Sequence, residues 1–410
     1  MAGGLDWPGI QQKETTAVQH RGSGALDGVR VLEMGQVLAG PFAGAILADL
    51  GAEVVKLERV EGGDDARRMG PAFRHGDALN FQIFNRGKQS VAVDMKSVAG
   101  RAHFERLAAE SDIFIHNLRP GVPQALGIDG ASLCARHPRL IYCEISAFGH
   151  LGPMAMQPGY EPLIQAFSGL SSTNGGPDDP PMRSGASVCD QGTGMWVVIG
   201  ALAMLQQRAR TGRGGLLQTS LLETAMVWNG QKADAFANVG ALPQRHRSGH
   251  PGFVPYEAFD TADGPLLICC GNDRLFAKLA TELRRPDWVG DERFATNRAR
   301  LLHKDALVTQ LEPLLMARPR SEWLKRFEAA GVPCAPVHSL PEALNHPQLQ
   351  ALGMLASVPN GGFSLTALPL TIDGVRPTPG GAAPSLGADN ARHGLPPAPP
   401  SDTPNTKETP

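Results

Sequence analysis

The sequence lacks several features that would assign it to a class of protein at once. No run of 18 apolar residues is free of charge, so the sequence predicts no membrane span. The net charge of −2 comes without a basic stripe, which argues against a nucleic-acid partner. Hydrophobic residues make up 42% and charged residues 19%, the balance of a globular protein long enough, at 410 residues, for more than one domain.

Cysteine pairs and targeting signals are also missing. None of the six cysteines lies in a CxxC pair, so the sequence predicts neither a disulfide framework nor a metal site, and a reducing, cytoplasmic setting is expected. Residues 1–25 lack the apolar core of a signal peptide and are expected to form a flexible extension. The Pro-, Gly- and Ala-rich end predicts a disordered tail over 387–410.

Strand and helix patterns alternate along the first 150 residues. Short apolar runs predict strands at 29–34, 53–58, 90–94, 112–117 and 140–146, with helices between some of them at 40–50 and 98–109. This alternation is typical of right-handed βαβ units in a doubly wound, mostly parallel α/β sheet. Ligands of such sheets bind beyond the carboxyl ends of the strands, where this chain has the loops 35–40, 59–64 and 117–121.

None of these loops is a nucleotide-binding fingerprint. The segment Gly35–Gly40 lacks the spacing of GxGxxG and the lysine of a P-loop, so the use of nicotinamide or of nucleoside triphosphates is not supported. The loops do hold isolated cations beside glycines, Arg59 and Arg119 among them. These could anchor a phosphate or a carboxylate, or they could be plain surface charge.

Asp190 stands directly before a long apolar helical run, Met195 to Gln207. A carboxylate at a helix start faces unpaired N–H groups and the positive end of the helix dipole, and both favour its ionised form. The sequence therefore predicts an ionised Asp190. The small residues around it, Gly185, Ala186, Gly192 and Gly194, are expected to let a bulky substrate approach. Two interpretations stay open at this point: a plain N-cap, where Asp is favoured, or a carboxylate nucleophile.

A set of motifs runs through most of the chain in a fixed order. They include Leu26-Asp-Gly-Val-Arg-Val-Leu-Glu33, Asn117-Leu-Arg-Pro-Gly121, Gly159-Tyr-Glu161, Asp190-Gln-Gly-Thr-Gly-Met195 and Gly331-Val-Pro-Cys-Ala-Pro336. With these motifs, from about Leu26 to Arg376, the chain resembles the class III CoA-transferases of the CaiB/BaiF type. That group contains formyl-CoA transferase and crotonobetainyl-CoA:carnitine CoA-transferase.

The resemblance implies a fold and a reaction. It implies a doubly wound large domain, a smaller α+β domain and an interlocked homodimer. It also implies that Asp190 attacks an acyl-CoA and forms a mixed anhydride and then an aspartyl-CoA thioester. CoA would thereby move to a free carboxylic acid without ATP, a metal or a permanently bound cofactor. Glu161 corresponds to an active-site acid that could position or protonate groups near Asp190, or could be a structural ion-pair partner.

The resemblance also implies domain boundaries and CoA contacts. The large CoA-binding domain is expected over 26–225 and 331–386, with the small domain between them over 226–330. The residues expected to hold CoA follow the carboxyl ends of several strands: Val37, Leu38, Ala39, Arg59, Val93, Asp94, Met95, Lys96, Asn117, Leu118, Arg119, Gly159 and Tyr160.

Departures from formyl-CoA transferase bear on the substrate. Leu38 replaces a Gln, Pro158 replaces a Lys, and Ser248–Gly252 replaces a polyglycine flap, so formyl and oxalate are poor candidates. A dicarboxylate pair such as succinyl-CoA and another organic acid is favoured. The candidates to face a second carboxylate are Arg67, Arg68, Arg183 and His250.

Three other interpretations stay open. The 2-methylacyl-CoA racemases share the fold but resemble Gly-His-Asp where this chain has Gly159-Tyr-Glu161, and Tyr, with a pKa of about 10, is a poor proton carrier at neutral pH. Cys189 could be a hydrolase nucleophile, although no His lies within its motif. A binding protein with a degraded site is disfavoured by the intact motif around Asp190.

Overall fold

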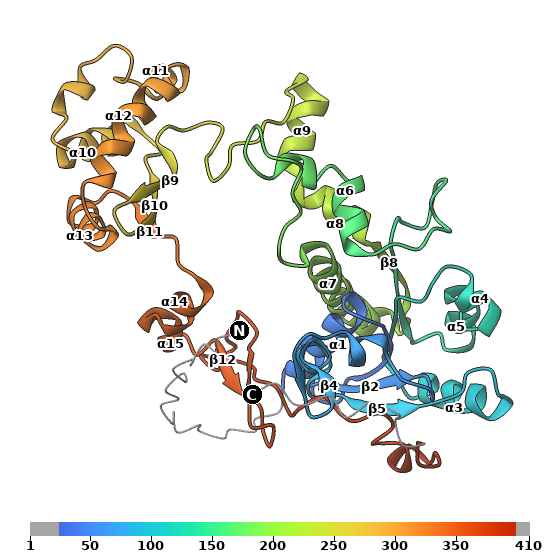
Figure 1. The fold of residues 1–410 in the computed structure, drawn as a ribbon. Coiled ribbons are helices and arrows are strands. Elements are labelled where there is room, and N and C mark those ends of the chain that lie inside the picture. Colours follow the sequence, from blue (N-terminus) through green and yellow to red (C-terminus); the bar gives the residue numbers. More distant parts are fainter. Residues whose placement is uncertain (1–23, 399–410) are drawn as a thin grey trace, which may run out of the picture. The chain divides into compact units, whose positions relative to one another are not determined.

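The computed structural model describes residues 24–398, and the chain folds into two compact units (Figure 1). Within the described range, unit 1 comprises residues 24–168, 184–230 and 347–398, and unit 2 comprises residues 169–183 and 231–346. The extension expected over 1–25 lies almost wholly outside the described residues, as does the end of the expected tail, 399–410.

A six-stranded parallel sheet forms the centre of unit 1. Its strands are β1 (Arg30–Met34), β2 (Glu53–Glu58), β5 (Gln89–Ala92), β6 (Ile113–His116), β7 (Ile141–Ser146) and β8 (Gly215–Ser220). They lie in the order β5-β2-β1-β6-β7-β8, and Val31 of β1 pairs with Val54 on one side and Ile113 on the other. The chain thus builds outward from β1 to one edge and then from β6 to the other, which confirms the expected parallel α/β sheet. The switch point between β1 and β6 is where such sheets bind ligands.

Helices connect and cover these strands. The helices of unit 1 are α1 (Ala39–Asp49), α2 (Leu79–Asn85), α3 (Val98–Ala109), α4 (Val122–Leu126), α5 (Gly130–Arg136), α6 (Glu161–Phe167), α7 (Val188–Thr211), α8 (Leu221–Trp228) and α15 (Pro347–Ala351). Phe104 of α3 and Leu133 of α5 join Leu32, Phe114 and Tyr142 of the sheet in one buried apolar cluster. Small hairpins are formed by β3 (Phe73–Arg74) with β4 (Asp77–Ala78), and by β12 (Leu355–Ser357) with β13 (Ser364–Thr366).

A buried group of charged side chains lies beneath the carboxyl end of β1. Lys56 Nζ contacts Glu33 Oε1 and Asp64 Oδ2, both at 3.0 Å, and Lys88 Nζ contacts Glu33 Oε2 at 2.5 Å. Burial by itself lowers the pKa of Lys56, but the carboxylates of Glu33 and Asp64 raise it above its usual value. Burial lowers the pKa of Lys88 to about 8. Removing one member of such a group leaves an uncompensated buried charge, so these pairs are costly to break.

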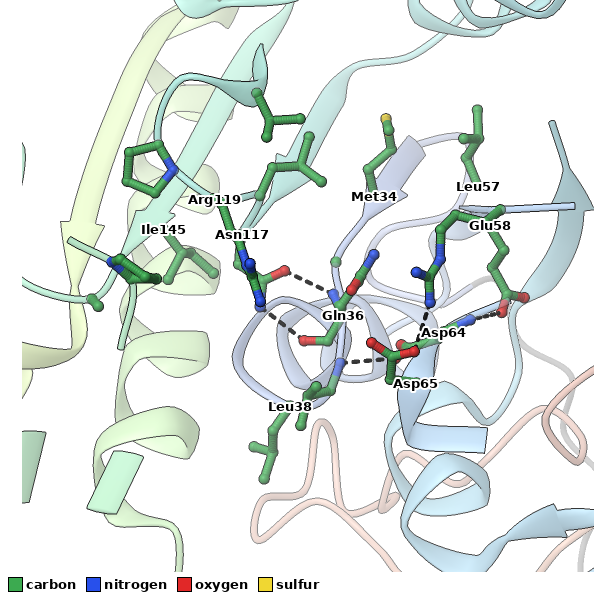
Figure 2. Close-up of a pocket in the computed structure, with 18 of the residues that line it drawn as sticks. Met34, Gln36, Leu38, Leu57, Glu58, Asp64, Asp65, Asn117, Arg119 and Ile145 are labelled. Carbon is green, nitrogen blue, oxygen red and sulfur yellow. Dashed lines mark hydrogen bonds and ion pairs between the residues drawn. The ribbon is translucent and has the colours of Figure 1, made fainter. Parts of the chain in front are cut away.

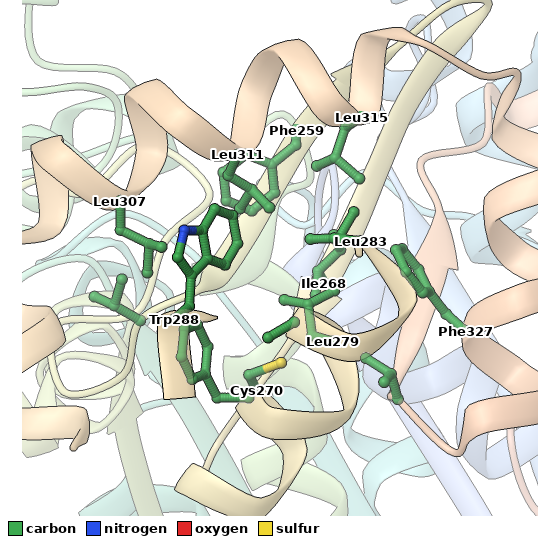
Figure 3. Close-up of a cluster of buried hydrophobic side chains, with 14 of the residues drawn as sticks. Phe259, Ile268, Cys270, Leu279, Leu283, Trp288, Leu307, Leu311, Leu315 and Phe327 are labelled. Atoms are coloured by element: carbon green, nitrogen blue, oxygen red, sulfur yellow. The ribbon is translucent and has the colours of Figure 1, made fainter. Parts of the chain in front are cut away.

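Unit 2 contains a three-stranded antiparallel sheet in the order β11-β10-β9. Its strands are β9 (Tyr256–Thr261), β10 (Gly264–Cys269) and β11 (Cys334–Pro336). Its helices are α9 (Gly230–Val239), α10 (Asp273–Glu282), α11 (Asn297–Leu302), α12 (Lys304–Met316), α13 (Arg320–Ala330) and α14 (Leu340–Asn345). The core packs Phe259 and Ile268 of the sheet against Trp288, Leu311 and Phe327 (Figure 3).

The limits of this unit differ from the expected 226–330. Cys334 of β11 pairs with Ile268 of β10, so the chain stays in unit 2 to residue 346 instead of leaving it at 331. The segment 169–183 also belongs to unit 2. The sequence gives no sign of β11, because a strand of three residues that contains Pro336 is too short to show an apolar alternation.

The first part of the expected disordered tail is folded against the sheet. Asp389 Oδ2 accepts a hydrogen bond from Ser90 N at 2.8 Å, and Asn390 Oδ1 accepts one from Ala92 N at 2.8 Å. Because β5 is an edge strand, its outward N–H groups have no neighbouring strand to bond. The expectation of disorder is therefore wrong for 387–398, since polar side chains hydrogen-bond this segment to β5 and Leu395 packs against the apolar cluster of the sheet.

Candidate functional site

A cleft of about 1290 Å³ opens at the carboxyl ends of the strands of unit 1 (Figure 2). It lies at the switch point, because its lining includes the residues that follow β1 and β6. The structure brings nearly all of the expected site residues together there: Val37, Leu38, Arg59, Val93, Asp94, Met95, Lys96, Asn117, Leu118, Arg119, Gly159, Tyr160, Glu161 and Asp190. Ala39 is different, since it begins α1, is only 2% exposed and does not line the cleft.

Asp190 lies inside the first turn of α7 and does not cap it. The helix begins at Val188 after the N-cap residue Ser187, whose side chain makes no capping hydrogen bond. Asp190 is therefore the third helical residue, and the N-cap interpretation is wrong. Its side chain is half-buried and reaches the cleft.

Glu161 supplies the carboxylate that the start of α7 needs. It is the first residue of α6 and is 4% exposed. Its Oε1 accepts a hydrogen bond from Cys189 N at 2.9 Å and another from Gln165 Nε2 at 2.9 Å, and its Oε2 is 3.5 Å from Asp190 N. A carboxylate from another helix thus occupies the positive end of α7, the position from which Asp190 was expected to gain its stabilisation.

Gln165 is a member of the site that was not predicted. Its Oε1 accepts a hydrogen bond from Ser184 N at 2.8 Å while its Nε2 donates to Glu161, so it fixes the orientation of the Glu161 carboxylate. The signal in the sequence is the spacing of four residues between Glu161 and Gln165, which places both side chains on one face of a helix.

The environment of Asp190 opposes its ionisation. Burial, the negative charge of Glu161 and a hydrogen bond between the two carboxyl groups raise the pKa of Asp190 to about 7. The expectation of a stably ionised carboxylate is therefore wrong in direction, because desolvation and the Glu161 charge outweigh the helix dipole. Asp190 therefore keeps its proton to a higher pH than an ordinary aspartate does. Raised carboxyl pKa values of this kind cluster at functional sites.

The glycines after Asp190 serve helix packing. An ideal Cβ at Gly192 would lie 2.7 Å from Trp228 Cζ2, and one at Gly194 would lie 2.8 Å from the carbonyl oxygen of Ala39. These two glycines let α8 and α1 approach α7 closely, and they do not leave the expected open space for a ligand. At Gly185 the space is open, since an ideal Cβ there would meet no atom within 4 Å.

Cys189 is packed, although it is next to Asp190. It is 0% exposed, and burial together with the negative charges of Glu161 and Asp190 raises the pKa of its thiol to about 12. A thiol that is neutral and buried is a poor nucleophile. The hydrolase interpretation loses its support.

Cations line the cleft where the strands end. The Arg59 guanidinium donates to the carbonyl oxygen of Gly63 at 2.9 Å and pairs with Asp65 at 2.6 Å. Lys96 and Arg119 are exposed, and the part of the chain that the structure describes provides no ion pair to either. Both side chains are therefore able to bind the phosphates of an anionic ligand.

No set of three or more His, Cys, Asp and Glu side chains is placed to hold a metal ion within residues 24–398. The candidate carboxylate-binding residue Arg67 is also committed elsewhere. It is buried, and its guanidinium contacts Glu58 at 2.7 Å and Asp77 at 2.9 Å. Arg68 pairs with Asp65 at 3.1 Å, while Arg183 and His250 belong to unit 2.

Known proteins with the same features identify the family. The sequence profile of CoA-transferase family III matches residues 26–390. The acetyl-CoA:oxalate CoA-transferase of Acetobacter aceti is 36% identical over 362 residues, which cover 88% of this chain and 92% of that protein. The succinate–glutarate CoA-transferase of Agrobacterium fabrum is 37% identical over 335 residues, which cover 80% of this chain and 84% of that protein.

A solved structure agrees with this. The crystal structure of a CaiB/BaiF family protein from Brucella suis superposes with a TM-score of 0.83 at 35% identity and covers 90% of this chain and 98% of that one. The chain therefore belongs to CoA-transferase family III and is a CoA-transferase.

Proposed function

We propose that the protein moves CoA from an acyl-CoA to a free carboxylic acid through covalent intermediates on Asp190. The single observation that carries this proposal is the position of Asp190, a carboxyl group with a raised pKa in the cleft at the switch point of the sheet. The names of the relatives support the reaction class, since those proteins are acyl-CoA:carboxylate CoA-transferases.

The reaction consists of four balanced acyl exchanges. An oxygen of the Asp190 carboxylate attacks the thioester carbon, the C–S bond breaks, and CoA leaves as a thiolate. The thiolate attacks the Asp190 carbonyl carbon, which releases the donor acid as a carboxylate and leaves an aspartyl-CoA thioester. The acceptor carboxylate attacks this thioester to form a new anhydride and free the thiolate. The thiolate then attacks the acceptor carbon, which yields the new acyl-CoA and regenerates Asp190.

The residues around Asp190 have definite tasks in this scheme. Glu161 binds the N–H groups at the start of α7 and keeps the pKa of Asp190 high. Only the ionised form of Asp190 attacks, and its raised pKa makes that form more basic than an ordinary aspartate. Lys96 and Arg119, together with Arg59, bind the phosphates of CoA, whose acyl end then reaches Asp190 along the cleft.

The acceptor is a small organic acid. The relatives named above act on oxalate and glutarate, so a dicarboxylate remains the favoured class, and oxalate belongs among the candidates despite Leu38 and Pro158. Arg67 is no longer a candidate to bind the distal carboxylate, because Glu58 and Asp77 occupy its guanidinium.

Racemisation of 2-methylacyl-CoA is the alternative activity of this fold. It needs a proton carrier near neutral pH, and no histidine occurs among the described residues that line the cleft. Tyr160 stands where the racemases have histidine. Incubation of a single 2-methylacyl-CoA epimer in deuterium oxide distinguishes the two reactions, because racemisation exchanges the proton at C2 and CoA transfer does not.

We further propose that the protein is a cytoplasmic, interlocked homodimer. Among residues 24–398, α7 is the one helix long and apolar enough to cross a membrane, by length and composition alone. Part of it is buried in unit 1, but Met195, Trp196 and Ile199 leave 46%, 38% and 51% of their surfaces exposed. We assign this apolar surface to contact with a second copy. Light scattering during size-exclusion chromatography tests this, and a monomer would contradict it.

A panel of acyl-CoA donors and free acids tests the activity. Each donor is incubated with each acid, and the CoA products are identified by mass spectrometry. We expect at least one pair to exchange CoA without ATP, and Asp190→Asn to abolish the exchange while the protein stays folded. Full activity in Asp190→Asn, or an ATP requirement, would contradict the proposal.

A further inference from the structure

The loop between β1 and α1 is held at its backbone by side chains from other segments. Gln36 N donates to Asn117 Oδ1 at 2.7 Å, and Asn117 Nδ2 donates to the carbonyl oxygen of Gln36 at 2.8 Å (Figure 2). The side chain of Asn117 thus makes the pair of hydrogen bonds that the backbone of a neighbouring strand would make with Gln36. It links the loop after β1 to the loop after β6, at the switch point of the sheet. Both polar atoms of Asn117 are engaged in this way, although the motif around Asn117 was expected to bind CoA.

The next peptide group is held from a different direction. Val37 N donates to Asp64 Oδ1 at 3.0 Å, and the same oxygen accepts from Ala66 N at 3.0 Å. Asp64 is 2% exposed, and its other oxygen contacts Lys56, which also donates to the carbonyl oxygen of Gly35 at 2.7 Å. The two clamping carboxyl and amide groups, Asp64 and Asn117, lie on either side of Gln36 in Figure 2.

The hydrogen bonds of Asn117 to Gln36 and of Asp64 to Val37, together called the clamp, hold an unfavourable backbone conformation. Val37 has φ of 64°, in the left-handed region, which is a genuine outlier for a β-branched residue. Such a conformation costs roughly 1–3 kcal/mol and persists only when the surroundings impose it. The hydrogen bonds of Asn117 and Asp64 on the two adjacent N–H groups are what impose it here.

The clamped loop leads directly to the reacting carboxyl group. Leu38, which lines the cleft, follows Val37, and α1 begins at the next residue. The first turn of α1 packs on α7 at Gly194, one helical turn beyond Asp190, where a Cβ would lie 2.8 Å from the carbonyl oxygen of Ala39. The backbone path of Gln36 and Val37 therefore sets the position of Leu38 relative to Asp190. Leu38 forms the wall of the cleft at this point.

We propose that Asn117 and Asp64 are positioning residues that hold this wall ready for acyl transfer, and that the Asn117 side chain is not a ligand for CoA. The inference rests on the proposed reaction at Asp190. It assigns Asn117 to the geometry of the chemical step and leaves CoA binding to the cations and to the backbone of the neighbouring loops.

The first test separates kcat from CoA binding. We expect Asn117→Ala to lower kcat at least tenfold while the dissociation constant for free CoA, measured by calorimetry, changes less than threefold. A loss of CoA affinity with unchanged kcat would show that Asn117 binds the ligand directly and would overturn the inference. If the wild type transferred CoA between no pair of acids, the proposed function would fail instead, which is a distinguishable outcome.

The second test uses an isosteric variant and needs no substrate. In Asn117→Asp the carboxylate still accepts from Gln36 N but repels the Gln36 carbonyl oxygen, and only its protonated form can make both bonds. The pKa of the new group is therefore raised in the folded state. We expect the stability deficit against the wild type to be small near pH 4 and to grow as the pH rises through that raised pKa.

The exposed Asn345, whose Nδ2 donates to the carbonyl oxygen of Pro341, offers a matched control. Asn345→Asp should show no comparable growth of the deficit with pH. A flat deficit in Asn117→Asp, or an equal pH dependence in both variants, would overturn the clamp.

Discussion

Replacing Glu161 by Gln should move the pH profile of CoA transfer to lower pH. Gln keeps an oxygen for Cys189 N, so the start of α7 stays bonded, while the negative charge beside Asp190 is removed. Burial, the largest cause of the raised pKa of Asp190, remains, but the charge and the carboxyl hydrogen bond are lost. A neighbouring charge shifts a carboxyl pKa by about one to three units, so the pKa of about 7 should fall to between about 4 and 6.

The size of the effect on rate follows from the ionised fraction. With a pKa of about 7, about 3% of Asp190 is ionised at pH 5.5, and a fall of one unit raises this to about 24%. The ratio of kcat/KM for Glu161→Gln to that of the wild type should therefore rise about eightfold or more between pH 8.5 and pH 5.5.

The assay is the initial rate of CoA transfer over this pH range, with the best pair from the substrate panel. The value of kcat/KM on the plateau at high pH reports any loss of positioning of Asp190. The pH at the midpoint of the profile reports the pKa of Asp190, and hence the effect of the removed charge. Glu223→Gln is a suitable control, because Glu223 lies in the first turn of α8 and does not line the cleft. An unchanged midpoint in Glu161→Gln would refute the role given to Glu161.

Three further predictions concern stability and the neighbouring thiol. Asp190→Asn should raise the melting temperature at pH 8, because the raised pKa makes ionisation of the wild type costly, and the gain should vanish as the pH falls through about 7 toward 4; a gain independent of pH would contradict this. Gly44→Ala should lower the free energy of unfolding by roughly 3–5 kcal/mol, measured by chemical denaturation, since its Cβ would overlap the carboxylate of Glu33, which pairs with Lys56 and Lys88. Gly380→Ala, at a position where a Cβ meets no atom within 4 Å, should lower it little. Cys189→Ala should keep kcat/KM within about threefold of the wild type, because the buried thiol takes no part, and a loss of activity with an intact fold would revive the thiol mechanism.

The parallel sheet could be predicted because its strands are short apolar runs set between helical patterns. The strand at 53–58 and the helix at 98–109 match β2 and α3 residue for residue. The sequence pattern over 223–240 also predicts a single helix, but the structure interrupts it, with α8 ending at Trp228 and α9 starting at Gly230. Glycine weakens a helix interior, and that signal was present in the sequence.

The charge state of Asp190 could not be predicted from its own segment. It depends on Glu161, which is 29 positions away and reaches α7 only in the folded chain. Local rules for helix starts gave the wrong sign because they consider only the dipole. The same holds for Asn117, whose motif indicated a CoA contact while its bonds to Gln36 exist only in three dimensions.

The folded tail shows a related limit. Composition predicts disorder where apolar residues are scarce, but Asp389 and Asn390 attach the chain to the edge strand β5 through a few hydrogen bonds. Such an attachment depends on the exposed edge of the sheet, which composition does not describe.

The central claim is that Asp190 becomes covalently acylated and then carries CoA. Trapping tests it most directly: the protein is incubated with an acyl-CoA donor, treated with hydroxylamine and digested, and the peptide that contains Cys189 and Asp190 is sequenced by mass spectrometry. We predict a hydroxamate on Asp190 that forms only when the donor is present and is absent from Asp190→Asn. Modification of Cys189, or an unmodified peptide under turnover conditions, would contradict the claim.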